Sequence, residues 1–500
     1  MIENLLAGFS LFMAPTSLLA LAVGVVIGMV IGAIPGMSTV MAVSIVLPFT
    51  FGLDPTASIL LLLGIYKGGM FGGSISAILI NTPGTPAASC TMLDGYPMSQ
   101  KGQARPALEM ALFASCFGDM ISNFVLIAFA AWLASFALDF GPPELFALVV
   151  FALTIVAGVA ADQIAKGFIA MAVGLLMATV GLDLIAGTHR FTFGHVDLSA
   201  GLSLVPVLIG LFAIPEVLEN FSSKDKSDEV TPDVTGTKLG ARRFFSHWRT
   251  LFRGSFIGVI LGVVPGLGPT PAAFFSYGSA RRKSPEPESF GKGNIDGVAA
   301  AESANSAVGG SSMVPLLALG IPGDVVTAVI LGAFMIHGLQ PGPLMFESNM
   351  DLIYAIFMGL IAGSIILFVL GKASVGVLSK ILNLRPSILL PTVLVLCVYG
   401  SYAVNKNMFD VLVMFMVGVF GYLMVKLNFP RAPLLIGFVL GPLLEDNFRQ
   451  SLLIGQGEIS FFFSSKISIL FWGFTAVYLL SQFGGSLIKW FKNQKIEHAT

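Results

Sequence analysis

Residues 24–42 form an apolar segment that a Pro-Gly pair interrupts. The segment reads GVVIGMVIGAIPGMSTVMA, and residues 254–272, GSFIGVILGVVPGLGPTPA, repeat its four glycines and its proline 230 positions further on (24 to 254). Proline removes a backbone donor and ends a helix. Inside a membrane, such irregular backbone is tolerated only where it is buried in protein or lines a wet cavity. A break that occurs twice therefore constrains the fold more than any other feature of the chain.

The composition is that of a membrane protein. Of the 500 residues, 55% are hydrophobic and only 11% are charged, whereas a soluble domain has about 25% charged residues. The net charge of −1 argues against a nucleic-acid partner. The three cysteines form no CxxC or Cys/His motif, so neither a disulfide framework nor a metal site of that kind is expected. The N-terminus has no basic residue before its apolar stretch and does not resemble a cleavable signal peptide.

Further apolar segments are long enough to cross a bilayer, which takes about 20 residues. A polar stretch at 221–253 separates the two groups of segments. These segments are residues 58–80, 107–138, 144–161, 166–187 and 199–217 in the first half, 295–320, 351–370, 387–404, 408–426 and 432–455 in the second half, and 467–488 near the C-terminus.

The sequence predicts an all-α polytopic membrane protein with two inverted-topology repeats, which contain broken or re-entrant helices, and one extra C-terminal helix. Its parts are a first membrane repeat (1–217), a cytoplasmic linker (218–249), a second, inverted membrane repeat (250–455), and an extra transmembrane helix with a cytoplasmic tail (456–500). Inverted repeats with interrupted helices are typical of secondary transporters.

Basic residues indicate the orientation, because cytoplasmic loops carry an excess of Lys and Arg. The central polar stretch is rich in both, and we place it in the cytoplasm. Counting crossings from there puts the N-terminus outside and the C-terminus inside. The count treats 17–52 and 254–281 as hairpins that enter and leave on one face, which Arg281-Arg282-Lys283 favours. Broken crossings are the alternative, and the second repeat is inverted in either case.

Each half contains a second Pro-Gly break, at Pro83-Gly84 and Pro322-Gly323. The half-helix that follows a break would point free N–H groups, with partial positive charge, at an anion. Exposed carbonyls at the breaks could bind a cation. The expected substrate-binding residues are Ser38, Thr39, Lys67, Asn81, Thr82, Pro83, Gly84, Thr85, Gly268, Thr270, Ser311, Ser312, Pro322 and Gly323, and the expected Na⁺ ligands are Pro35, Gly36, Asn81, Pro265, Gly266, Asn305 and Ser306.

Several of these features have a second interpretation. The breaks could be kinks that only help transmembrane helices pack, and close packing is the expected role of Gly24, Gly28 and Gly32. Lys67 could attract a carboxylate or extend to the membrane interface. Two acidic residues just before the second GGS motif could face a cavity, contact a cation or cap a helix; they are Asp296 and Glu302. Asp324 stands where a helix-capping residue is expected.

Long motifs resemble the large membrane subunit of tripartite tricarboxylate transporters, the TctA family. They are YKGGMFGGSISAILINTPGTPAA (66–88), PGLGPTPAAF (265–274) and DGVAAAESANSAVGGSSMVPLLALGIPG (296–323), with THRFTFG (188–194) and VPVLIGLFAIPEVL (205–218). The resemblance implies a small four-helix membrane subunit (TctB-like) and a periplasmic solute-binding protein (TctC-like) as partners, and a bacterial inner membrane as location. It also implies import of carboxylates such as citrate, driven by an ion gradient that is typically sodium. Asn305-Ser306 departs from the paired Asn that is common in the family.

We therefore expect the translocation subunit of a binding-protein-dependent secondary transporter that imports a di- or tricarboxylate by alternating access. No cofactor is expected. Na⁺ is favoured as coupling ion because the candidate ligands are neutral oxygen donors. Proton-coupled symport and a carboxylate channel are the alternatives. An enzyme is not expected, since the chain has no HExxH motif, no convincing pair of buried Asp residues for an aspartyl protease and no Walker A sequence.

The predicted orientation can be tested by cysteine labelling in intact and permeabilised cells. Single cysteines in place of Glu3 and Lys495 should react from opposite sides of the membrane, because one terminus is expected outside and the other inside. Labelling of both positions from the same side would contradict the topology.

Overall fold

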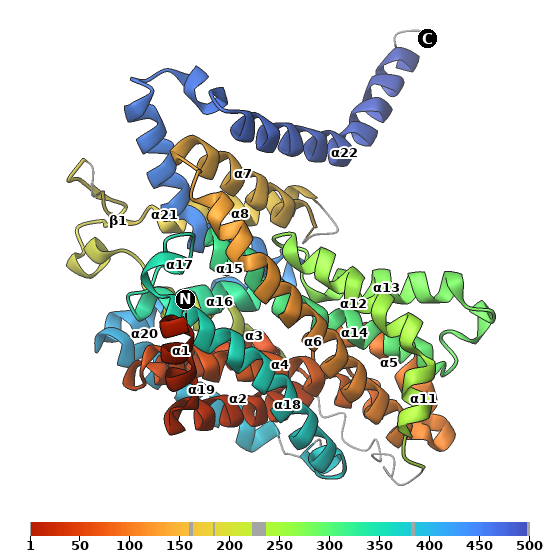
Figure 1. The fold of residues 1–500 in the computed structure, drawn as a ribbon. Helices are drawn as coiled ribbons and strands as arrows, with labels where there is room; N and C mark the ends of the chain where they lie inside the picture. Colours follow the sequence, from red (N-terminus) through yellow and green to blue (C-terminus); the bar gives the residue numbers. More distant parts are fainter. Residues whose placement is uncertain (1, 160–163, 184–185, 223–236, 382–385, 498–500) are drawn as a thin grey trace. The chain divides into compact units, whose positions relative to one another are not determined.

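The computed structural model describes residues 2–159, 164–183, 186–222, 237–381 and 386–497, whose regular elements are helices apart from one two-stranded sheet (Figure 1). Among these residues, six helices are long and apolar enough to cross a membrane. The prediction of an all-α polytopic membrane protein is confirmed. Part of the polar linker, residues 223–236, lies outside the described residues.

The chain forms two compact units, and each combines residues from both halves of the sequence. Unit 1 comprises Met1–Leu138 and Ser203–Val425. Its helices are α1 (Ile2–Met13), α2 (Pro15–Ala33), α3 (Thr39–Val46), α4 (Pro55–Ile80), α5 (Ala88–Met98), α6 (Ala104–Ala137), α9 (Leu204–Leu208), α10 (Ile214–Ser222), α11 (Ala241–Ser246), α12 (Trp248–Val263), α13 (Pro269–Lys283), α14 (Ile295–Ser311), α15 (Met313–Leu319), α16 (Val325–Ile336), α17 (Met345–Ser348), α18 (Met350–Ile381), α19 (Pro386–Asn405) and α20 (Met408–Lys426).

Unit 2 comprises Asp139–Leu202 and Lys426–Thr500. Its elements are α7 (Pro142–Val159), α8 (Ile164–Ala178), the strands β1 (Gly181–Leu182) and β2 (His189–Arg190), α21 (Arg431–Ile454) and α22 (Lys466–Glu497). Short 3-10 helices occur in the two units at Leu47–Gly52, Val196–Ala200, Pro287–Ser289 and Ile459–Phe463, and π-helical turns at Ser99–Gln103 and Ile209–Ala213.

Glycines on α2 allow its backbone to contact that of α4, which is buried along almost its whole length. A methyl group at Gly24 or Gly28 would overlap a backbone carbonyl oxygen of α4, at Leu61 or Ile65 respectively. One turn further on, Gly32 abuts the backbone of Gly69. Small residues permit such close approach of transmembrane helices, so the packing role expected for these glycines agrees with the structure.

The same packing recurs between α12 and α14. Gly254, Gly258 and Gly262 face Ala300, Ala304 and Val308, each of which lies 239 positions after its counterpart on α4 (61 to 300). The two halves therefore repeat a three-dimensional contact as well as a sequence pattern. The repeat boundaries and the inverted orientation stay predictions.

Most of the expected segments coincide with helices, but 166–187 is helical only to Ala178. The chain then forms an antiparallel hairpin of β1 and β2. Gly181 adopts a positive φ of 123°, which a helix does not accommodate. Residues 179–187 are still largely apolar, so hydrophobicity alone did not show where the helix ends.

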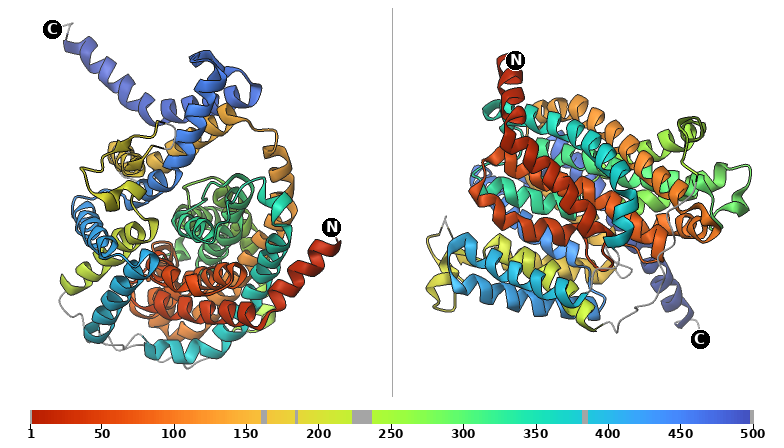
Figure 2. Two further views of the ribbon diagram at one scale, coloured as in Figure 1. Left: turned by 90° about the vertical axis from the view of Figure 1, so that its left-hand side faces the viewer. Right: turned by 90° about the horizontal axis from the view of Figure 1, so that it is seen from below.

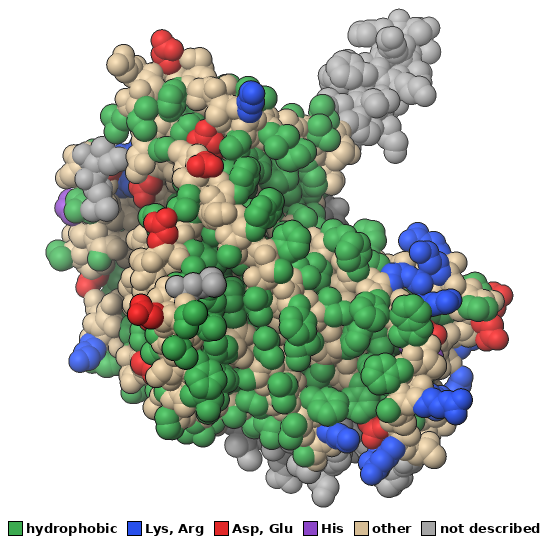
Figure 3. Space-filling view, viewed as in Figure 1, with side chains coloured by type: hydrophobic (Ala, Val, Ile, Leu, Met, Phe, Trp, Pro, Cys, Tyr) green, Lys and Arg blue, Asp and Glu red, His purple; other side chains and the backbone are tan. Residues whose placement is uncertain are grey.

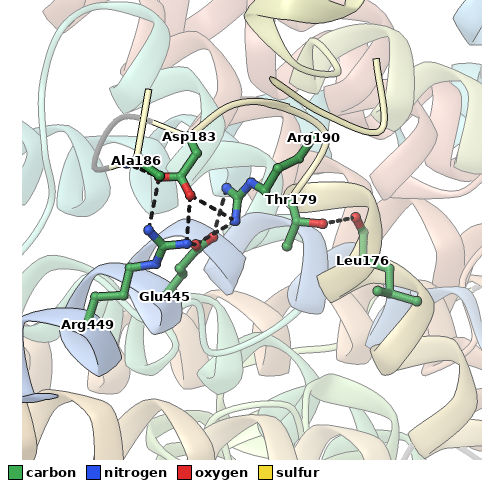
Figure 4. A network of polar contacts seen from close by, with 7 residues as sticks. All are labelled: Leu176, Thr179, Asp183, Ala186, Arg190, Glu445 and Arg449. Atoms are coloured by element: carbon green, nitrogen blue, oxygen red, sulfur yellow. Dashed lines mark hydrogen bonds and ion pairs between the residues drawn. The ribbon is translucent and has the colours of Figure 1, made fainter. Parts of the chain in front are cut away.

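A four-charge network joins the hairpin of unit 2 to α21 (Figure 4). Arg449 donates two hydrogen bonds of 2.9 Å to Asp183, and Arg190 Nη1 lies 2.7 Å from Glu445 Oε1. Arg449 also pairs with Glu445 at 2.7 Å. An arginine that donates two hydrogen bonds to one carboxylate fixes the orientation of both side chains and stabilises the contact. These pairs therefore anchor the hairpin to α21.

The surface of unit 1 carries large apolar side chains of the kind that face lipid. Phe124, Phe129 and Trp132 of α6 are exposed, as are Phe252 and Phe256 of α12. Green side chains cover this face in Figure 3, while Lys and Arg gather near the end of α13. At another edge of unit 1, α1 packs against the start of α18, where Gly8 abuts Tyr354 (Figure 2).

The contact between α2 and α4 makes a prediction about stability. Gly28→Ala should lower the free energy of unfolding by about 1–3 kcal/mol, because the added methyl group overlaps the Ile65 carbonyl. Gly278→Ala is the matched control, since Gly278 also lies in a helix but its methyl group would meet open space. Melting temperatures of the two purified variants in detergent provide the measurement. Equal melting temperatures would show that the helices can separate without cost.

Candidate functional site

The four Pro-Gly breaks all lie in unit 1, and the two breaks of each half meet. In the first half, the Gly84 N–H donates to the Gly73 carbonyl at 3.2 Å, and a methyl group at Gly84 would overlap the carbonyl of Gly32, near the end of α2. In the second half, the Gly266 N–H donates to the Gly323 carbonyl at 2.8 Å. Each half thus brings its two interruptions together through main-chain contacts.

A helix begins after each break: α3, α5, α13 and α16. Two of these N-termini carry a carboxylate of the protein itself. Glu216 of α10 accepts hydrogen bonds from Ser38 N at 3.1 Å and from Ser38 Oγ at 2.7 Å, at the start of α3. Asp324 caps α16 in a reciprocal capping box with Thr327, which confirms the capping expected for it. The partial positive charge at the starts of α3 and α16 is therefore compensated internally.

Among the described residues, the N-cap positions of α5 and α13 carry no carboxylate, although Glu302 of α14 accepts a hydrogen bond from Thr91 in the first turn of α5. Their N-cap residues, Ala87 and Gly268, make no side-chain capping hydrogen bond. Cys90 and Ala273, near the two helix starts, belong to one buried apolar cluster. Two helix N-termini of opposite halves are thus held in the same region of unit 1, and no acidic N-cap residue compensates their partial positive charge.

Three buried carboxylates lie among α4, α6, α14 and α16. Asp119 pairs with Lys67 at 2.5 Å and also accepts a hydrogen bond from Ser364. Asp324 accepts one from Tyr66 of α4. Glu302 accepts hydrogen bonds from Ser74 at 2.5 Å, from Ser115 at 2.8 Å and from Thr91.

The structure places the residues expected at the site in three different environments. Asn81 and Thr82 are exposed at the C-terminal end of α4, where Asn81 has a left-handed conformation. Pro83, Thr85, Pro265, Gly266 and Thr270 are half-buried at the breaks. Buried positions are Thr39, Lys67, Gly84, Gly268, Asn305, Ser306, Ser311, Ser312, Pro322 and Gly323, while Pro35 and Ser38 are half-buried and Gly36 is exposed.

Two of the buried residues have a polar atom without a hydrogen-bond partner: Thr39 Oγ1 and Asn305 Nδ2. Thr39 is the first residue of α3 and its side chain lies beside Gly69 of α4. Buried polar atoms are rarely unpaired in folded proteins. These two therefore mark places where a bound solute, ion or water would complete the structure. By contrast, Ser311 and Ser312 donate to carbonyls within α14.

Sequence reasoning missed the polar residues on α6 and α10. Asp119 provides the counter-charge of Lys67, and Ser115 binds Glu302. Glu216 closes the start of α3, and Asn220 donates to the Gly36 carbonyl at 3.0 Å. A signal was present, because an acidic residue inside an apolar segment is costly and usually functional.

Comparison with known proteins agrees with this architecture. The model of the tripartite tricarboxylate transporter TctA family matches residues 18–436. An uncharacterized 52.8 kDa protein in the TAR-I ttuC′ 3′ region of Agrobacterium vitis is 38% identical over 468 residues, covering 94% of this chain and 93% of that protein. An uncharacterized protein in the TAR-II ttuC′ 3′ region of the same organism is 39% identical over 211 residues, covering 42% and 87%. No solved structure matches. The chain belongs to the tripartite tricarboxylate transporter TctA family, and is thus a multi-pass membrane subunit of a tricarboxylate transporter.

Proposed function

We propose that the chain is the translocation subunit of a binding-protein-dependent secondary transporter, which imports citrate or a related di- or tricarboxylate together with Na⁺ by alternating access. Its partners are a small four-helix membrane subunit and a periplasmic solute-binding protein. It lies in the bacterial inner membrane with a periplasmic N-terminus and a cytoplasmic C-terminus. Membership of a transporter family supports this assignment over an enzymatic one.

The observation that carries the proposal is the difference between the four helix N-termini. Those of α3 and α16 already bind Glu216 and Asp324, whereas those of α5 and α13 have no acidic capping residue among the described residues. An anionic substrate would meet repulsion at the first pair and the partial positive charge of a helix N-terminus at the second. We therefore place the substrate carboxylates at Gly84-Thr85 and at Gly268-Thr270.

The charge of the substrate supports coupling to a cation. Each helix N-terminus supplies about half an elementary charge, so two of them compensate about one of the two or three negative charges of the substrate. Lys67 is the buried cation nearest in sequence to the breaks, but Asp119 already neutralises it. A co-transported cation would provide the missing positive charge, and the neutral oxygens at the breaks suit Na⁺ better than a proton.

Coupling distinguishes this function from its alternatives. In proteoliposomes that contain the chain and both partner subunits, an inward sodium gradient should drive uptake of a carboxylate against its own gradient. Sodium and proton gradients are imposed independently, and citrate and related carboxylates are compared. Uptake that follows only the proton gradient would identify a proton symporter. Equilibration without accumulation would identify a channel.

The meeting of the breaks predicts a sharp effect on uptake. Gly84→Ala and Gly323→Ala should each abolish transport, because the methyl group would overlap the Gly32 carbonyl or lie 2.6 Å from Ser312 Cβ. Size-exclusion profiles establish that the variants remain folded. Gly240→Ala is the control, since Gly240 is also outside a helix and a methyl group there meets nothing within 4 Å. Wild-type uptake in both Gly84→Ala and Gly323→Ala would show that the breaks are only kinks in the helices.

A further inference from the structure

Glu302 differs from Asp119 and Asp324 in how its charge is compensated. Asp119 has the ammonium group of Lys67, and Asp324 has the N-terminus of α16. Glu302 is fully buried, and no ion pair to it occurs among the described residues. Its hydrogen-bond donors are three neutral hydroxyl groups, and the neutral side-chain amide of Asn305 lies beside it. An ionised carboxylate in such a site is costly unless a positive charge joins it.

The hydroxyl groups around Glu302 come from three different helices. Ser74 lies in the middle of α4, Thr91 in the first turns of α5 and Ser115 in α6, and all three are fully buried. Each hydroxyl donates one hydrogen bond to the carboxylate and keeps lone pairs that can bind a cation. The cluster thus combines one negative charge with oxygen ligands from four helices, α14 included.

We propose that Glu302, Ser74, Thr91 and Ser115 form a sodium site inside unit 1; the choice of this ion rests on the function proposed above. Sodium, like other hard cations, prefers oxygen ligands. The Glu302 carboxylate balances the single charge of this ion, so the ion orders α5 and does not itself compensate the charge of the substrate. Among the described residues, no group of three or more His, Cys, Asp or Glu residues is placed to bind a metal ion. The site connects α5 to α4, α6 and α14. The N-terminus of α5 is one of the two helix ends proposed to bind the substrate.

This position couples the ion to the substrate. Thr91 lies three residues after the start of α5, whose N-terminus follows the Pro83-Gly84 break. Asn305, with its unpartnered Nδ2, lies one helical turn after Glu302 on α14. Binding of sodium to the Thr91 hydroxyl would fix α5 in the position in which its N-terminus, with its partial positive charge, faces the carboxylate of the substrate. The ion would then lie inside the protein, close to the first turn of α5 and without direct contact with solvent.

The test is direct binding of ²²Na⁺ to the purified full-length chain in detergent. Wild-type protein should bind the isotope saturably, and unlabelled Na⁺ but not choline should displace it. Glu302→Gln should lose binding. Ser115→Ala should raise the half-saturating concentration about tenfold, as expected for loss of one contact to a charged group. Ser122→Ala is the matched control: Ser122 is equally buried on α6 but donates to the Asp119 carbonyl instead, and its binding should equal wild type.

The outcomes separate this site from the proposed function. If uptake is driven by sodium but Glu302→Gln binds ²²Na⁺ like wild type, the site is wrong and the function stands. If wild-type protein binds no ²²Na⁺ while uptake follows the proton gradient and is lost in Glu302→Gln, Glu302 carries a proton and both proposals fail. Size-exclusion profiles of each variant show that a loss of binding does not reflect unfolding.

Discussion

The close contact between α2 and α4, and its repetition between α12 and α14, positions everything else in unit 1. Glycines at every fourth residue let two backbones touch where larger side chains would separate them. This contact brings the end of α2 against the Gly84 turn, so that two interruptions distant in sequence become neighbours. Without it, each break would expose unpaired backbone groups to lipid, at a cost of several kcal/mol for each group.

Because the breaks meet in pairs, their backbone groups satisfy one another in part. The Gly266–Gly323 hydrogen bond does so directly, whereas the Gly84 N–H donates to the Gly73 carbonyl inside α4. The four resulting helix N-termini differ in whether an acidic side chain caps them. Counting along the two repeats, α3 corresponds to α13 and α5 to α16, yet among the described residues only α3 and α16 have an acidic side chain bound at the N-cap. A repeated fold has thus acquired one anion-repelling and one anion-accepting pair of helix ends.

The buried charged side chains of unit 1 are also compensated inside the protein. A charge inside the membrane is retained only when it is paired or functional. Lys67 and Asp119 neutralise each other in a contact that also ties α4 to α6 and, through Ser364, to α18. Glu302 has three hydroxyl groups in place of a cation, and this difference is what makes it the candidate for ion coupling.

The sequence alone determined the class of fold, the four Pro-Gly breaks and the family resemblance, because apolar segments, helix-ending residues and long motifs are local properties. It also identified Asp324 as a helix cap and the glycines of α2 as packing residues. It could not show that Asn81 and Thr82 would be exposed, or that Glu216 would occupy the start of α3 from 178 residues away. Nor could it tell that Lys67 would be neutralised by Asp119, or that the segment after Ala178 would turn into a hairpin. Those facts depend on which helices touch, and only the tertiary structure decides whether a buried charge, a helix end or a hydroxyl group has a partner across space.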